Sequence, residues 1–293
     1  MVSTFREKVM IRTPKILVFD SGLGGLTVFR ALLERRPDAE FFYAADDLGF
    51  PYGPKSEAEV STLVLSAMER LIAAHAPDCV VIACNTASTL VLPQLRERWP
   101  NIPFVGTVPA IKPAAEQSQS RLITILATPG TVARDYTRDL IDKFAGHCDV
   151  TLIGSQKLAA LAEAFMQGVV ISDDDVAREI APCFVERDGR RTDAIVLACT
   201  HYPLLQDFFT RLAPWPVHWI DPAAAIARRA DHVISDRFPQ GALTGHEGGA
   251  PGFSFHFASG AAPAAKLTTT LNMFRKDGTL RPLSPPVAGR ELA

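Results

Sequence analysis

The sequence predicts an α/β protein built from two similar domains, and three observations lead to this prediction. Short, continuous apolar runs alternate with helix-like stretches along most of the chain. Continuous rather than alternating apolar runs are typical of strands covered on both faces, as in parallel sheets with crossover helices. The chain has 293 residues, enough for two modest domains with a substantial core. A motif that occurs twice, described below, indicates that the two domains are alike.

The predicted strands are the apolar, β-rich runs, taken in order along the chain. They are 16–19, 40–44, 79–83, 104–106, 122–127, 150–153 and 194–198. Residues 56–75 place apolar side chains near one helical face, and Ser56 followed by Glu59 has the pattern of a capping box.

The last part of the chain has a different composition. The stretch 239–252 is rich in Gly and Pro, and it precedes a predicted strand at 253–258 and a predicted helix at 264–274. Residues 1–13 and 276–293 show no periodicity, so we expect them to be flexible ends.

Composition excludes several classes of protein. Thirty Lys and Arg residues against 32 Asp and Glu residues leave a formal net charge of -2, which gives no support to a nucleic-acid or membrane-surface partner. The longest apolar runs have the length of strands, far short of the roughly 20 residues that a membrane helix needs. The N-terminal residues mix charges without the apolar stretch of a signal peptide. We therefore expect a cytoplasmic protein.

A repeated motif indicates two similar domains. Asp78 to Cys84 reads DCVVIAC, and Asp193 to Cys199 reads DAIVLAC, 115 residues later. A second pair of segments is also alike, since strands 16–19 and 122–127 both lead into a turn with a hydroxyl and a glycine, DSG and TPG. If the domains face one another about a pseudo-twofold axis, the two motifs lie on opposite sides of a shared cleft.

The two cysteines that end this motif are the first candidates for chemistry. In open parallel sheets, ligands bind outside the carboxyl ends of the strands, where Cys84 and Cys199 lie. The residues that follow them can form hydrogen bonds: Asn85 and Thr86 in one half, Thr200 and His201 in the other. Two opposed thiols can act as acid and base on the two faces of one carbon, form a redox couple, or bind a soft metal. The chain has five cysteines without CxxC spacing and only His201 close by as a further ligand, which argues against a disulfide framework and a metal site.

Two turns are further candidates. Asp20 to Gly25 (DSGLGG) follows the first predicted strand, but it has neither the GxGxxG nor the GK[ST] pattern of a nucleotide site. Such a turn can instead present backbone N–H groups and a hydroxyl to a ligand carboxylate, with Asp20 either forming the turn or assisting a thiol. Pro51-Tyr52-Gly53 is a Pro-bounded turn that can also place a Tyr hydroxyl and a Gly N–H as a substrate clamp.

Five motifs taken together resemble those of the glutamate racemases, in the aspartate/glutamate racemase superfamily. They are FDSGLGG (19–25), PYG (51–53), ACNTAS (83–88), TPGTV (128–132) and ACTHYP (198–203). The resemblance runs from about Lys15 to Phe274. Thr200-His201 after the second cysteine resembles the glutamate enzymes, because aspartate racemases tend to carry Thr-Glu there.

The resemblance implies cofactor-independent interconversion of L- and D-glutamate, which supplies D-glutamate for peptidoglycan synthesis. Cys84 and Cys199 would be the acid/base thiols, with Asp20 and His201 assisting them. The substrate-binding residues would be Asp20, Ser21, Pro51, Tyr52, Gly53, Asn85, Thr86, Thr128, Thr200 and His201. Glu163 resembles a family glutamate near the second thiol, although Ser155-Gln156 stands where the family usually has Cys-Pro, and the loop 45–50 also departs from the family pattern.

We expect residues 14–108 with 217–275 to form the first domain and 109–216 the second, with the active site in the cleft between them. Glutamate is the expected partner, and no cofactor or metal is expected. The sequence leaves open whether the chain forms a homodimer. No lysine has the strand-end context of a pyridoxal-phosphate site. The alternatives are a racemase for aspartate or another carboxylic acid, a non-catalytic glutamate-binding module, and a dithiol redox protein.

Overall fold

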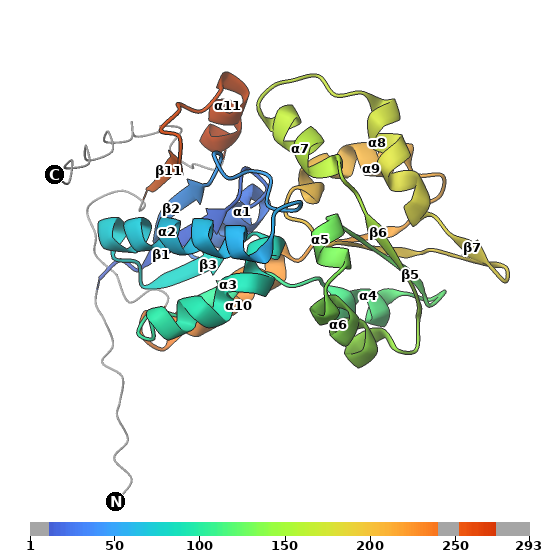
Figure 1. Cartoon of the computed structure of the whole chain (residues 1–293), viewed down its shortest axis with the longest axis horizontal. Helices are drawn as coiled ribbons and strands as arrows, with labels where there is room; N and C mark the ends of the chain where they lie inside the picture. Colours follow the sequence, from blue (N-terminus) through green and yellow to red (C-terminus); the bar gives the residue numbers. More distant parts are fainter. Residues whose placement is uncertain (1–11, 240–251, 274–293) are drawn as a thin grey trace, which may run out of the picture.

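The computed structural model describes residues 12–239 and 252–273, which form two α/β domains (Figure 1). The first domain is the five-stranded sheet with its helices, and the second domain is the four-stranded sheet with its helices. Every strand pair within these two sheets is parallel. The predicted fold class is therefore confirmed.

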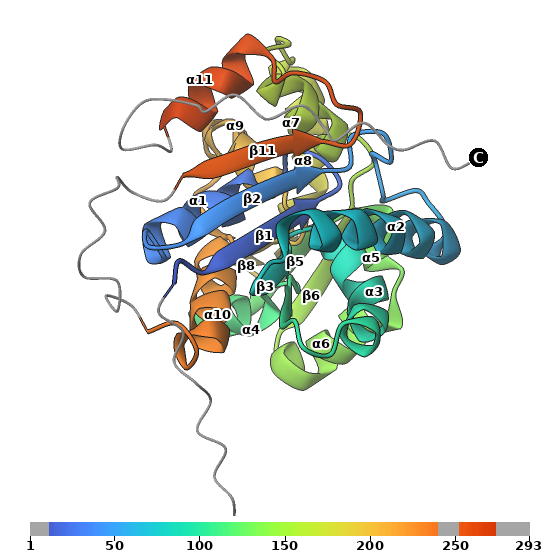
Figure 2. The same ribbon diagram turned by 90° about the vertical axis from the view of Figure 1, so that its left-hand side faces the viewer.

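The strands of both sheets match the sequence prediction closely. The first sheet has the order β11-β2-β1-β3-β4, of which Figure 2 shows β11, β2, β1 and β3 side by side. Its strands are β1 (Lys15–Asp20), β2 (Glu40–Ala45), β3 (Cys79–Ile82), β4 (Phe104–Gly106) and β11 (Phe253–Phe257). The second has the order β10-β9-β5-β6, with β5 (Leu122–Ala127), β6 (Asp149–Gly154), β9 (Ala194–Leu197) and β10 (His218–Ile220). Each strand predicted from the sequence is present. Its ends differ from the prediction by one residue at most.

The two sheets share one strand order. Without the edge strand β11, the first sheet reads β2-β1-β3-β4, and the second reads β6-β5-β9-β10 in the same sense. Strand β3, which leads to Cys84, therefore corresponds to β9, which leads to Cys199. The similarity that the repeated motif predicted is confirmed in the order of the strands.

The aspartates that open the repeated motif have equivalent structural roles. Asp78 accepts a hydrogen bond from the backbone N–H of Lys15 at 2.9 Å, where β1 begins. Asp193 accepts one from the backbone N–H of Ser120 at 2.8 Å, just before β5. Asp78 thus ties the beginning of β3 to the beginning of β1, and Asp193 ties the beginning of β9 to the segment before β5.

Helices cover both faces of each sheet, which explains why the strands are continuous apolar runs. On the first sheet, one face packs against α1 (Leu26–Arg35), α10 (Ala223–Ser235) and α11 (Ala265–Met273), and the other against α2 (Glu57–His75) and α3 (Asn85–Arg98). On the second sheet, one face packs against α7 (Leu158–Met166), α8 (Asp173–Ile180) and α9 (Gln206–Leu212), and the other against α4 (Ile111–Gln117) and α6 (Asp135–Ala145). The short helix α5 (Pro129–Val132) follows β5, and two 3-10 turns span Ala181–Cys183 and Tyr202–Leu205. The predicted capping box of Ser56 and Glu59 is present at the start of α2.

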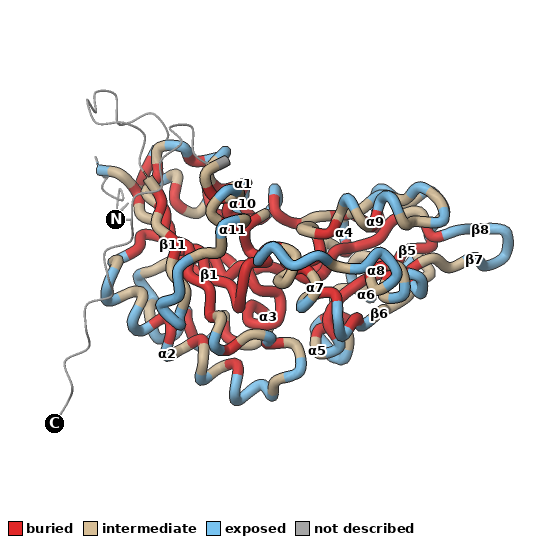
Figure 3. The backbone as a smooth tube through the Cα atoms, turned by 90° about the horizontal axis from the view of Figure 1, so that it is seen from above, coloured by how far each residue is buried: buried red, intermediate tan, exposed pale blue. Residues whose placement is uncertain are grey.

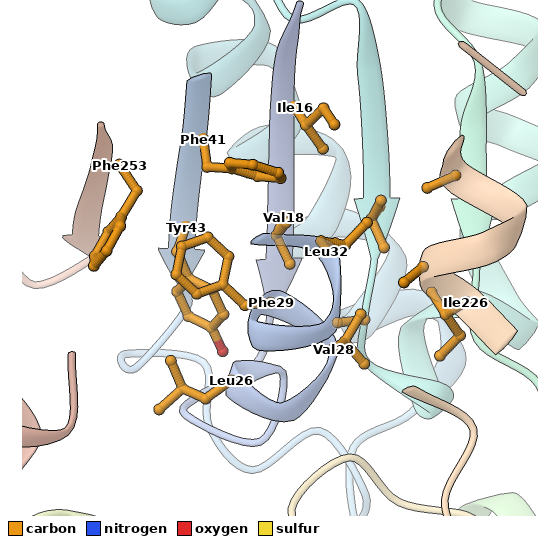
Figure 4. Packing of buried hydrophobic residues seen from close by; sticks show 14 of the residues in the cluster. Ile16, Val18, Leu26, Val28, Phe29, Leu32, Phe41, Tyr43, Ile226 and Phe253 are labelled. Carbon is orange, nitrogen blue, oxygen red and sulfur yellow. The ribbon is translucent and has the colours of Figure 1, made fainter. Parts of the chain in front are cut away.

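Phe29 of α1 anchors this helix on the first sheet (Figure 4). Its ring meets those of Phe41, Tyr43 and Phe253 edge to face, with centroids 5.8, 5.4 and 5.1 Å away. Because α1 starts directly after the Asp20 to Gly25 turn, this packing also fixes where the turn lies.

The chain crosses between the domains after β4 and again after β10. Strand β10 pairs with β9 in the second sheet, whereas α10 packs against α1 in the first domain. The sequence analysis assigned residue 217 onwards to the first domain. In the structure the chain crosses to the first domain only after Ile220. Strand β10 escaped the prediction because it has only three residues and His218 is exposed.

A short antiparallel hairpin was also not predicted. Its strands are β7 (Glu186–Arg187) and β8 (Arg190–Arg191), and it projects from the second domain as an exposed loop (Figure 3). Its charged strands, two residues each, carry no apolar pattern that a sequence prediction could use.

The structure describes only part of the predicted flexible ends. Arg12 lies within them, yet its guanidinium forms an ion pair with Asp78 at 2.5 Å, which holds this residue against the first domain. Residues 1–11 and 276–293, and most of the Gly- and Pro-rich stretch (240–251), lie outside the described residues. In the described part of the chain, no helix has the length and apolar character needed to cross a membrane.

Candidate active site

A cavity of ≈ 320 Å³ lies at the carboxyl ends of strands from both sheets. This volume is near the lower end of the range of about 300 to 1,000 Å³ that is usual for small-molecule sites. The sequence-predicted residues that line it are Ser21, Pro51, Tyr52, Gly53, Cys84, Asn85, Thr86, Thr128, Cys199, Thr200 and His201. The two remaining candidates, Asp20 and Glu163, lie behind this lining.

Cys84 lies between β3 and α3, where it is the N-cap residue of the helix. Its Sγ is 3.7 Å from Oγ of Ser21. Burial and the charge of Asp20 raise the pKa of the Cys84 thiol to about 12. Cys84 is therefore held as a thiol at neutral pH.

Cys199 has the opposite electrostatic surroundings. Its Sγ is 4.0 Å from Nδ1 of His201, whose Nε2 is 2.9 Å from a carboxylate oxygen of Glu163. Burial lowers the pKa of His201, but the hydrogen bonds with Cys199 and Glu163 and the charge of Asp20 outweigh it and raise this pKa well above 6.5. The Cys199 side of the cavity therefore holds an imidazole that stays protonated to higher pH than usual, next to the sulfur.

Asp20 acts on the cavity through a neighbour. It is fully buried, and its carboxylate accepts hydrogen bonds from the hydroxyl of Thr200 and from the backbone N–H groups of Gly22 and Gly25, each at 3.2 Å. Burial raises the pKa of Asp20, and the charge of His201 and the two N–H groups reduce this effect without cancelling it. Asp20 thus holds Thr200 of the second domain in place from the first.

The glycines of the Asp20 to Gly25 turn allow the second domain to approach closely. A Cβ at Gly24 would overlap the His201 ring, and one at Gly22 would lie 2.7 Å from a Glu163 oxygen. The N–H of Leu23 donates to Glu163 at 2.9 Å. The expectation that this turn presents its N–H groups to a ligand carboxylate was wrong for three of them, because the carboxylates of Asp20 and Glu163 accept these bonds.

The expected Tyr52 clamp also differs from the prediction. The Tyr52 hydroxyl is buried and donates to Asp46 at 2.5 Å, so its hydrogen is not free for a substrate. The Tyr52 side chain still lines the cavity. Across the cavity, a Cβ at Gly53 would lie 3.2 Å from the side chain of Thr128, so the two turns meet across the domains.

Among the lining residues that the structure describes, Asn85 is the one with a buried amide that lacks a partner. Among the described residues, neither its side-chain oxygen nor its nitrogen has a hydrogen-bond partner, although the residue is only 2% exposed. An unpartnered buried polar group costs about 1 to 3 kcal/mol, so a ligand with donors and acceptors would be favoured here. Within residues 12–239 and 252–273, no group of three or more His, Cys, Asp or Glu side chains is arranged to hold a metal ion.

Sequence reasoning missed several lining residues, and most of them are apolar. They are Phe50, Pro54, Pro129, Ser155, Gln156, Ala159, Ala160 and Ala198. The Phe50 ring lies 5.2 Å from the His201 ring, between centroids. Ser155 accepts a bond from the N–H of Leu158 at 3.0 Å and donates to Glu179 at 2.6 Å. A serine three residues before an apolar helix is a capping signal that would have identified its role at the start of α7.

Comparison with known proteins identifies the family. The Asp/Glu/Hydantoin racemase family profile matches residues 27–230. The chain belongs to this family. The predicted resemblance is thereby confirmed, and this racemase is an enzyme of the isomerase class.

Individual relatives agree with the family match. The racemase is 58% identical over 222 residues to the glutamate racemase of Brucella anthropi, covering 76% of this chain and 80% of that protein. It is 56% identical over 219 residues to the glutamate racemase of Agrobacterium fabrum, covering 75% and 80%. Among solved structures, glutamate racemase of Escherichia coli in complex with L-glutamate and the activator UDP-MurNAc-ala matches with a TM-score of 0.79 and 37% identity, covering 89% of this chain and 95% of that one. The Thermus thermophilus enzyme in complex with beta-chloro-D-alanine matches with a TM-score of 0.61 and 28% identity, covering 85% and 88%.

Proposed function

We propose that this racemase interconverts L- and D-glutamate without a cofactor, by proton transfer between two cysteines. The observation that carries the proposal is that Cys84 and Cys199, one from each domain, line the same cavity. Glutamate as substrate is supported by the relatives named glutamate racemases and by the related Escherichia coli enzyme bound to L-glutamate. A preference for aspartate or another carboxylic acid is the alternative.

One thiolate and one thiol are needed at the same time. A free thiol with a pKa near 8.5 is only a few per cent ionised at neutral pH, so its surroundings must favour the thiolate. Cys199, whose sulfur lies next to the His201 imidazole, removes the α-proton from one face. Cys84, held as a thiol by burial and by Asp20, returns a proton to the other face. For the other enantiomer the two roles are exchanged.

The carbanion formed by this step needs stabilisation, because the α-proton of an amino acid is very weakly acidic. The free amide of Asn85 and the hydroxyl of Thr86 line the cavity as donors for the α-carboxylate, whereas the Thr200 hydroxyl already donates to Asp20. Each well-placed donor can contribute about 3 to 4 kcal/mol to the transition state, as in an oxyanion hole.

The cellular role follows from the family resemblance. The D-glutamate product would supply peptidoglycan synthesis, and the reaction would take place in the cytoplasm.

The proposal is tested by polarimetry on L-Glu, D-Glu, L-Asp and D-Asp, with protein dialysed against chelator and hydroxylamine. We expect both glutamate enantiomers to racemise, and kcat/KM for aspartate to be lower by at least about tenfold, since one missing methylene changes selectivity about 10- to 200-fold. Equal rates on aspartate would favour the alternative substrate. Activity that returns only with a metal or pyridoxal phosphate would reject the mechanism. No racemisation at all would leave a binding module or a dithiol redox protein, which thiol titration before and after mild oxidation separates.

A further inference from the structure

The two thiols are equivalent in the strand order but differ in their nearest charged partners. The repeated motif places Thr86 two residues after Cys84, where the second domain has His201 two residues after Cys199. Cys84 therefore has no imidazolium corresponding to His201. The titratable and charged groups that interact with Cys84 are Asp20, Tyr43, Tyr52, Cys199 and Arg134. Of these groups in the described part of the chain, Arg134 is the one that carries a positive charge.

Arg134 reaches the helix that follows Cys84 from the other domain. It precedes α6 in the second domain, and its Nη1 donates to the backbone carbonyl of Thr86 at 3.2 Å and to the hydroxyl of Thr89. The acceptors are the second and the fifth residue of α3, the helix whose N-cap is Cys84. The guanidinium is thus bonded to the N-terminal part of this helix, across the boundary between the domains.

The first turn of α3 matters for this thiol because it supplies the backbone N–H of Ala87 to the sulfur, a contact that lowers the pKa of Cys84. The same turn carries Asn85, whose amide faces the cavity. Arg134 is half-buried, so its charge acts through a medium less polar than water. An arginine keeps its charge under these conditions, whereas a lysine or a histidine loses its proton more readily.

We propose that Arg134 is a positioning residue for the Cys84 half of the reaction, which holds the first turn of α3 from the opposite domain and supplies the positive charge that Cys84 otherwise lacks. The inference rests on the proposed two-thiol function. It means that a residue of the second domain assists proton transfer by Cys84, the thiol of the first domain.

The test compares Arg134→Met in two single-cysteine backgrounds. In Cys199→Ser only Cys84 can remove an α-proton, and in Cys84→Ser only Cys199 can. The probe is β-chloroalanine of both hands, which loses chloride once the α-proton is removed and then hydrolyses to pyruvate and ammonia. We expect Arg134→Met to lower pyruvate release about tenfold in the Cys199→Ser background, the effect of one unit in the pKa of a thiol. In the Cys84→Ser background, where Cys199 removes the proton, we expect Arg134→Met to change pyruvate release by less than about twofold.

Two further variants separate charge from structure. Arg134→Lys keeps the charge and should recover most of the lost rate. Arg138→Met removes an exposed arginine one turn further along α6 and should have no effect in either background. A loss shared by both backgrounds, no loss in either, or a loss that Arg134→Lys shows in full would each overturn the proposal.

A measurement that needs no substrate distinguishes this proposal from the proposed function. The rate at which iodoacetamide alkylates Cys84 at one fixed pH, followed by peptide mass analysis, reports its thiolate fraction. Arg134→Met should slow alkylation of Cys84 about tenfold and leave the alkylation rate of Cys199 unchanged. An unchanged Cys84 rate overturns the role of Arg134 even if racemisation is observed, and a slower rate supports it even if glutamate proves not to be the substrate.

Discussion

Cys84 and Cys199 occupy equivalent strand ends, but their nearest polar partners differ. His201 and Glu163 lie on the Cys199 side, and burial with the charge of Asp20 acts on the Cys84 side. The partners of the two thiols are therefore asymmetric, although the strands that lead to them are equivalent.

Replacing either thiol tests whether each serves one face. Cys84→Ser and Cys199→Ser should each nearly abolish racemisation, because turnover needs both proton transfers. Each variant should still catalyse elimination from one enantiomer of β-chloroalanine, since that reaction needs only one abstraction. By family resemblance we expect Cys84 to act on the D form and Cys199 on the L form. Pyruvate release from the same enantiomer in both variants would contradict the two-sided geometry.

Glu163→Gln tests the partner of His201. The Glu163 bond helps to raise the pKa of His201, so without the carboxylate the imidazolium loses its proton at lower pH. The alkaline limb of the kcat/KM profile should therefore move to lower pH by about one unit, the smaller effect expected for a close opposite charge. Glu179→Gln removes a similar charge that is bonded to Ser155 instead, and should leave this limb in place. A limb that stays fixed in Glu163→Gln would show that Glu163 does not set the protonation of His201.

At the residue scale, the sequence predicts the cavity lining better than the hydrogen bonds behind it. Residues next to a strand end share the cavity because parallel strands end at one edge, which the local pattern reveals. The partners of Tyr52 and Leu23 are Asp46 and Glu163, and the second of these lies 140 residues away in the chain. No local pattern specifies that pairing.

Among the elements, the turn after β1 shows that a glycine-rich segment can make contacts between the two domains rather than bind a ligand. Its glycines admit His201 and Glu163 of the second domain, and its N–H groups are bonded to carboxylates of the protein. The sequence correctly placed this turn between β1 and α1. Its partners could not be predicted, because they depend on how the second domain packs against it.

Asp193→Asn tests the carboxylate that ties β9 to the segment before β5. Burial raises the pKa of Asp193, but its bonds to Ser118, Ser120 and Gln119 outweigh this and leave the pKa below 3.8. A carboxyl group whose pKa is lower in the folded than in the unfolded state stabilises the fold at pH values above its unfolded pKa. This stabilisation is lost as the pH falls through its folded pKa. We expect Asp193→Asn to lower the free energy of unfolding by about 1 to 2 kcal/mol at pH 7.

The pH dependence provides the check on this prediction. Denaturant titrations of Asp193→Asn and the unmodified chain should converge as the pH falls below 3.8, where the carboxylate becomes protonated. Asp188→Asn, on the exposed hairpin, removes a charge without such bonds and should leave stability unchanged. A difference that persists undiminished in acid would mean that the carboxylate charge is not what stabilises the strand.

For the whole molecule, a ligand that contacts both domains should stabilise both. At 100 times its Kd, glutamate should raise the free energy of unfolding by about 2.7 kcal/mol. Hydrogen exchange should slow together at 84–88 in the first domain and at 198–202 in the second, which both border the cavity. Protection confined to one domain would contradict a site shared between them.

The two chain crossings affect the order in which the protein can be completed during synthesis. The strands of the second sheet are all present once the chain has reached Ile220, and its sheet lies within one continuous segment. One face of the first sheet must wait, since α10, β11 and α11 come later and the buried Arg36 pairs with Asp231, 195 residues further on. Domains generally fold as units during translation, and contacts between distant residues form slowly. The nascent chain therefore carries a finished second domain while Ile16, Val18 and Phe41 still expose an apolar surface, which makes the first domain the one that needs protection from aggregation on the ribosome.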